Sequence, residues 1–116
     1  PFPQGGGVSA FEALWMGVPM VTLAGDRPSG RIAASLLHQV DLNDFAVNDE
    51  QAYVERAVEA VRDLERLKVI RATLRERVYA MPATQLKAYA RAVEDGYRER
   101  WRAWCQKQTA VRETAA

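Results

Sequence analysis

The sequence predicts an α/β fold that is predominantly helical. A run of three glycines, Gly5–Gly7, precedes a short helical segment and then an apolar extended segment, Met20–Leu23. From Ile32 onward, apolar side chains recur about every 3.6 residues, the period of an α-helix. The chain has 116 residues, enough for one domain with a modest core. We therefore expect one clear strand, one or two further short strands, and helices elsewhere.

The first expected helix is short and follows the glycine loop directly. It covers Ala10–Met16, and Gly17 is the residue type that commonly ends a helix. Pro19 suits the first position of a strand, and Met20–Leu23 includes residues that favour extended backbone. The order glycine loop, helix, strand is therefore predicted for the N-terminal quarter of the chain.

A loop, a helix, a second short strand and another helix are expected next. Ala24–Gly30 is rich in turn-forming residues. A very short strand is expected at Phe45–Val47, after which Asn48 or Asp49 can cap a helix. The apolar face of the helix before this strand contains Ile32, Ala33, Leu36, Leu37 and Val40, and that of the helix after it contains Tyr53, Val54, Ala57, Val58 and Val61.

Two further helices complete the chain. Asp63 can cap the first of them, Pro82 ends it, and Thr84 opens the last, long helix. The inward face of the first is expected to contain Leu64, Leu67, Ile70 or Arg71, Leu74 and Val78, and the apolar face of the second contains Leu86, Tyr89, Ala90, Val93, Tyr97, Trp101 and Trp104. We expect the aromatic stripe to pack against protein rather than against bases, because no basic residues accompany it on the same face. The small, polar segment 109–116 is expected to be a disordered tail.

Composition excludes several classes of function. Sixteen Lys and Arg oppose fifteen Asp and Glu, so the net charge of +1 gives no field that would attract nucleic acid or a membrane surface. No apolar run is long enough to span a bilayer, and no signal peptide is recognisable, so a cytoplasmic location is expected. Cys105 and His38 are each the only residue of their type, which argues against a disulfide or a metal site.

The glycine loop and the helix after it have the chemistry of a phosphate site. Glycines let backbone amides approach an anion closely, and the N-terminus of the helix adds unpaired N–H groups and the positive end of its dipole. Ser9 and Glu12 lie in the first turn. The same pair also fits a capping box, in which Ser9 and Glu12 each bond the other's backbone amide, and the sequence alone leaves both readings open.

A dinucleotide site is the competing interpretation of this segment. Residues 5–10 match the pattern G-x-G-x-x-A, and Asp26 follows the next strand, where a dinucleotide fold has its ribose-binding carboxylate. The helix Ala10–Met16 has only about two turns, which is short for the helix of such a unit. A Walker A loop is excluded because no Lys-Ser or Lys-Thr follows the glycines.

The segment GGGVSAFEALWMGVPMVTLAGDRPSGRIAASLL, with DLERLK at residues 63–68 downstream, resembles the C-terminal catalytic lobe of O-GlcNAc transferases. The resemblance is strongest to bacterial members that carry tetratricopeptide repeats, and it extends to Cys105. It implies the second half of a Rossmann-like lobe in a two-lobe, GT-B type glycosyltransferase. That enzyme class transfers a sugar, here N-acetylglucosamine, from a UDP donor to a Ser or Thr hydroxyl of a protein, with no cofactor or metal expected.

The resemblance also assigns roles to individual residues. Gly6, Gly7, Val8 and Ser9 would meet the diphosphate of the donor, and Glu12 would hold the ribose hydroxyls. The family usually has two threonines where Val8 and Ser9 stand, so one phosphate-binding hydroxyl is missing here. No catalytic residue is assigned to this chain, because the groups that activate the acceptor lie elsewhere in such enzymes.

These expectations define a fragment rather than a whole enzyme. Residues 1–108 would form part of the catalytic lobe, and the partners would be the N-terminal lobe and tetratricopeptide repeats of the same chain, besides the acceptor protein. Such a fragment would be inactive by itself. A helical interaction module without catalytic function is the remaining alternative, because the last three helices could fold without the donor loop.

Overall fold

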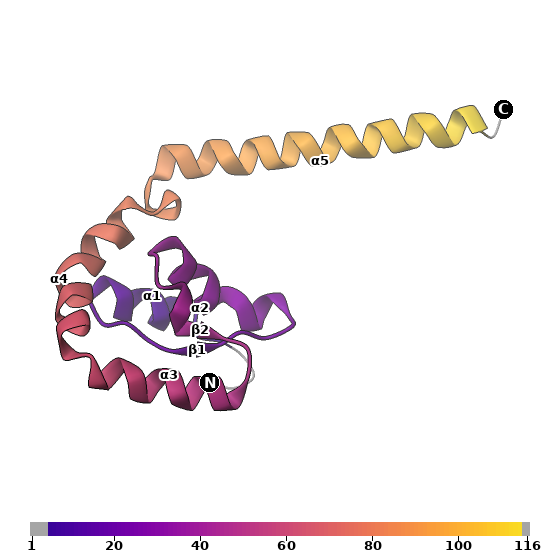
Figure 1. Cartoon of the computed structure of the whole chain (residues 1–116). Coiled ribbons are helices and arrows are strands. Elements are labelled where there is room, and N and C mark those ends of the chain that lie inside the picture. The colour runs from indigo at the N-terminus through magenta and orange to yellow at the C-terminus, as the bar shows by residue number, and fades with distance from the viewer. Residues whose placement is uncertain (1–4, 115–116) are drawn as a thin grey trace. The chain divides into compact units, whose positions relative to one another are not determined.

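The computed structural model describes residues 5–114, with side chains as far as residue 108. It is mostly helical with a small parallel sheet, as the sequence predicts. The chain divides into two compact units, Pro1–Met81 and Pro82–Ala116. Figure 1 shows the first unit as two short strands surrounded by helices, and the second as one long helix with a short turn before it.

Helix α1, Val8–Trp15, follows the glycine loop and ends in a Schellman motif. The amide of Val18 donates to the carbonyl of Ala13, and the amide of Gly17 donates to that of Leu14, both at 2.9 Å. Gly17 has a φ of 76°, the left-handed conformation that glycine adopts without strain. The sequence prediction that Gly17 ends this helix is confirmed.

Strands β1, Thr22–Leu23, and β2, Ala46–Val47, pair in parallel. Thr22 lies opposite Ala46 and Leu23 opposite Val47, and the amide of Ala24 extends the pairing to the carbonyl of Val47. Both strands lie within the segments expected from the sequence but are shorter. The connection between them consists of helix α2, Pro28–Gln39, and the 3₁₀ turn η1, Asn43–Phe45.

Helices α3, Glu50–Arg62, and α4, Leu64–Ala80, each begin at an aspartate. The carboxylate of Asp49 accepts from the amide of Ala52 at 2.7 Å, and that of Asp63 accepts from the amide of Arg66 at 2.9 Å. These bonds satisfy backbone donors that a helix N-terminus leaves free. The predicted cap at Asp63 is confirmed, and of the two candidates for the cap of α3, Asn48 and Asp49, the structure has Asp49.

The core of the first unit lies where α1, α2 and α4 meet the short sheet. Its buried members are Leu14, Leu37, Val40, Leu42, Phe45, Ala60, Ile70, Leu74, Val78 and Met81. The apolar faces expected on α2 and α4 are therefore largely correct, although Ile32 and Leu64 are exposed. The apolar face expected on α3 does not enter the core. Four of its residues are exposed, namely Tyr53, Val54, Val58 and Val61, whereas Ala60 is the buried residue of this helix.

The second unit consists of the 3₁₀ turn η2, Pro82–Thr84, and helix α5, Leu86–Thr114. Trp101 stacks on Trp104 with ring centroids 5.1 Å apart. Within this unit the aromatic stripe is exposed, with 64% of Trp101 and 52% of Trp104 accessible. The helix continues past residue 108 as far as Thr114, whereas residues 115–116 of the expected tail lie outside the described residues.

Candidate functional site

The glycine loop passes close to the start of α2. A Cβ on Gly5 would lie 3.4 Å from the carbonyl oxygen of Gly30, and a Cβ on Gly6 would lie 3.3 Å from the side chain of Ala10. A Cβ on Gly7 would meet nothing within 4 Å. The loop is therefore packed tightly at its beginning and open where it joins α1.

The N-terminus of α1 leaves backbone donors available. Gly7 is the N-cap, and the first helical bond joins the amide of Phe11 to the carbonyl of Gly7 at 3.1 Å. The amides of Val8, Ser9 and Ala10 precede this bond and so have no partner within the helix. Together with the helix dipole they form the kind of site that binds phosphate oxygens.

The capping box that the sequence allows at Ser9 and Glu12 is absent. The helix begins two residues earlier than a Ser9 cap requires, and no side chain caps it. No acidic residue lies in its first turn. The hydroxyl of Ser9 and the carboxylate of Glu12 are both exposed rather than engaged in capping.

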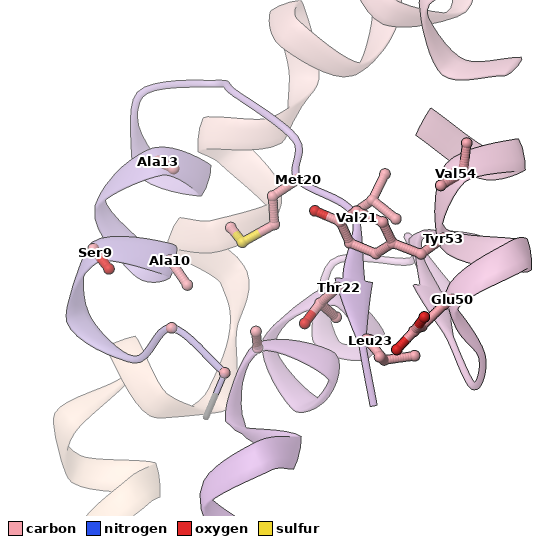
Figure 2. Close-up of a pocket in the computed structure, with 13 residues that line it drawn as sticks. Ser9, Ala10, Ala13, Met20, Val21, Thr22, Leu23, Glu50, Tyr53 and Val54 are labelled. Atoms are coloured by element: carbon pink, nitrogen blue, oxygen red, sulfur yellow. The ribbon is translucent and has the colours of Figure 1, made fainter. Parts of the chain in front are cut away.

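Ser9 lies at the edge of a cavity of about 570 Å³ beside β1. Figure 2 shows Val21 and the β1 residues Thr22 and Leu23 between α1 and α3, with Tyr53 and Glu50 on the α3 side. The cavity is lined by Gly5, Gly6, Ser9, Ala10, Ala13, Met20, Val21, Thr22, Leu23, Ala33, Glu50, Tyr53 and Val54. It is mostly apolar, with hydroxyl and carboxylate groups at its margin.

Glu12 does not line this cavity. It lies in a separate depression of about 460 Å³ with Phe11, Trp15 and Met16. The structure therefore brings Gly5, Gly6 and Ser9 together and places Glu12 on the neighbouring face of α1. Asp26, the residue on which a dinucleotide site would depend, is exposed in the loop before α2 and lines neither space.

Sequence reasoning did not single out three polar residues of the larger cavity: Thr22, Glu50 and Tyr53. Thr22 is mostly buried on β1. Glu50 begins α3, immediately after the aspartate cap. Because β1 and β2 are parallel, their carboxyl ends lie at the same edge of the sheet, where ligands commonly bind. Glu50 follows the carboxyl end of β2 closely in the sequence, and this position is the signal that could have identified it as a site residue.

A cluster around Asp44 and Phe45 holds α3 and α4 to the end of η1. Arg56 and Arg66 both bond the Asp44 carboxylate, at 3.1 and 2.9 Å. Their guanidinium carbons lie 5.0 and 5.4 Å from the centroid of the Phe45 ring. These contacts fix the helix that carries Glu50 and Tyr53 against the sheet.

Among the side chains of residues 5–108, no group of three His, Cys, Asp or Glu is placed to hold a metal ion. Within residues 5–114, no helix combines the length and the apolar character that crossing a membrane requires.

Comparison with models of protein families shows to which family this chain belongs. Residues 3–93 match the model of glycosyl transferase family 41. The chain belongs to glycosyl transferase family 41. The resemblance inferred from the sequence is therefore confirmed.

Relatives of this family 41 chain include plant proteins and a bacterial enzyme of known structure. SPINDLY of Solanum lycopersicum, named as a probable UDP-N-acetylglucosamine–peptide N-acetylglucosaminyltransferase, is 35% identical over 104 residues, 90% of this chain and 11% of that protein. The SEC protein of Arabidopsis thaliana, named in the same way, is 28% identical over 104 residues.

Among solved structures, a mutant of the Thermobaculum terrenum O-GlcNAc transferase superposes with a TM-score of 0.79 at 35% identity. The match covers 91% of this chain and 20% of the bacterial chain. The family 41 chain thus spans about a tenth of the length of the plant relatives, and a fifth of the bacterial one.

Proposed function

We propose that this chain is the donor-binding part of the C-terminal catalytic lobe of a UDP-N-acetylglucosamine:protein transferase. The observation that carries the proposal is the family 41 match, which includes the glycine loop and α1. In such an enzyme the sugar passes from UDP to a Ser or Thr hydroxyl of an acceptor protein. The chain is inactive alone, and the donor is its only small-molecule ligand.

The site residues keep the roles that the resemblance implies. The amides at Gly6–Ser9 and the hydroxyl of Ser9 bind the diphosphate, with Val8 contributing its amide only. Glu12 accepts bonds from the ribose hydroxyls on the adjoining face of α1. As the glycosidic bond breaks, negative charge develops on the UDP leaving group, and the amides and dipole of α1 stabilise it. No residue of this chain is assigned as the base that takes the acceptor proton.

We further propose that the unit is a partial Rossmann-like fold. Gly5 lies against Gly30, whose carbonyl accepts from Gly25, two residues beyond the end of β1. In a β-α-β unit the strand before the helix runs parallel to the strand after it, and here α1 connects the glycine loop to β1. The N-terminal lobe and tetratricopeptide repeats of a longer chain are the proposed partners, and the aromatic stripe of α5 is the proposed contact.

Calorimetric titration of the full-length enzyme with UDP tests this function. Ser9→Ala should raise the Kd about tenfold, because a hydrogen bond to a charged group contributes roughly 1.5–3 kcal/mol. Ser35→Ala, an exposed serine of α2, is the matched control and should leave the Kd unchanged. Glu12→Ala should weaken UDP binding more than it weakens binding of the 2′-deoxy analogue.

Two outcomes would replace the proposal. Binding of NAD that depends on Asp26 would establish the dinucleotide site instead. Absence of any nucleotide binding by a folded full-length protein would favour a helical interaction module.

A further inference from the structure

The direction of α1 depends on what holds its C-terminal end. The helix has eight residues and is therefore about 12 Å long. Its N-terminal amides face the proposed diphosphate site, so a tilt of the helix would displace them directly. Ala10 and Leu14 are its buried residues and face the interior of the first unit, and contacts at the C-terminal end of the helix, beyond Leu14, further restrict its rotation and tilt.

Helix α4 supplies those contacts from two successive turns. A Cβ on Gly17, just beyond the end of α1, would lie 2.9 Å from the carbonyl oxygen of Arg71. One turn later, the guanidinium carbon of Arg75 lies 5.0 Å from the centroid of the Trp15 ring. Trp15 is the last residue of α1. Residues four apart share a helix face, so Arg71 and Arg75 hold the same end of α1.

Helix α4 is itself firmly placed. Ile70, Leu74 and Val78 are buried in the core of the first unit. Arg77 donates from Nη1 to the carbonyl of Val40, the C-cap of α2, at 3.2 Å. Because α4 is held in place, its contacts with α1 restrict the movement of α1.

We propose that Arg75 is a positioning residue of the donor site, acting through Trp15 to set the orientation of α1. This inference rests on the proposed function, because it concerns the affinity of the same diphosphate site. The positive charge of Arg75 holds the indole ring by a cation–π contact, and it also lies at the end of α1 where a cation is favoured by the helix dipole. Arg75 does not touch the nucleotide.

The test uses the full-length enzyme and compares Arg75→Met with Arg75→Lys. Methionine keeps an apolar stem of similar length but removes the charge, whereas lysine keeps a cation over the ring. Arg75→Met should raise the Kd of UDP and the donor KM about threefold, the factor that an exposed cation–π contact supplies. Arg75→Lys should recover most of this loss. Arg62→Met, on the exposed end of α3, is the matched control and should leave both constants unchanged.

A double-mutant cycle with Trp15→Leu tests whether Arg75 acts through the indole. In the Trp15→Leu background, Arg75→Met should cause no further loss of UDP affinity. A purely structural role would instead lower kcat through loss of folded enzyme and leave the donor KM unchanged, so melting temperatures are measured for every variant. Additive effects of the two changes on the Kd would overturn the inference.

The failure of this inference is distinguishable from failure of the proposed function. If Ser9→Ala weakens UDP binding tenfold while Arg75→Met leaves it unchanged, the positioning role is refuted and the donor site stands. If neither substitution affects UDP binding, the donor site is refuted, and the positioning role falls with it.

Discussion

Gly17→Ala should destabilise the first unit more than any conservative change at the surface. Glycine at this position has a φ of 76°, where an alanine costs roughly 1–2 kcal/mol in backbone strain. The new Cβ would lie 2.9 Å from the Arg71 carbonyl oxygen, so α1 and α4 must also move apart. Adding this displacement, we expect a total loss of about 2–4 kcal/mol.

Hydrogen exchange at the amides of Leu74 and Val78 measures this loss in the 116-residue chain, since both residues are buried in the core. The melting temperature should fall by at least about 8 °C, given roughly 4–8 °C per kcal/mol in a domain of this size. Gly96→Ala is the control, and it should stabilise its helix where Gly17→Ala destabilises the first unit. A Cβ there meets nothing within 4 Å, and α5 should gain about 0.5–1 kcal/mol. Protection in Gly17→Ala equal to that of the parent chain would refute the packing of α1 on α4.

Three further predictions concern the aromatic stripe, the missing hydroxyl and the activity of the fragment. The double substitution Trp101→Ala, Trp104→Ala should reduce the free energy of unfolding of this chain only slightly, because both rings are largely exposed. In a full-length enzyme that buries the two rings, the loss should be about 3–5 kcal/mol, and denaturation curves of both proteins measure the difference. Equal losses in the two proteins would contradict the proposed contact. Val8→Thr should lower the Kd of UDP in the full-length enzyme, and an unchanged calorimetric Kd would place the diphosphate away from Val8. The 116-residue chain should transfer no labelled N-acetylglucosamine to an acceptor protein, and measurable transfer would show that it contains the acceptor machinery.

Local chemistry made several elements predictable from the sequence. The aspartate caps at Asp49 and Asp63 and the helix end at Gly17 depend only on residues within one turn, and all three are found. The capping box at Ser9 failed for an equally local reason, because the helix begins two residues earlier and Gly7 takes the N-cap position.

Long-range packing was less predictable. The apolar face of α3 has a helical period, yet Tyr53 and Val54 line a cavity beside β1 instead of entering the core. Periodicity shows that a face is apolar but not which surface covers it. For the same reason, the sequence could place Ser9 and Glu12 near the start of the same short helix but could not show that they line different spaces.

Hydrogen exchange of the full-length enzyme with and without UDP tests the central claim most directly. If the N-terminus of α1 holds the diphosphate, UDP should slow exchange at the amides of Gly6–Ala10, which precede the first helical bond. Ser9→Ala should reduce this protection at the same nucleotide concentration. Saturating UDP that protects other segments while leaving Gly6–Ala10 unchanged would contradict the donor-site assignment.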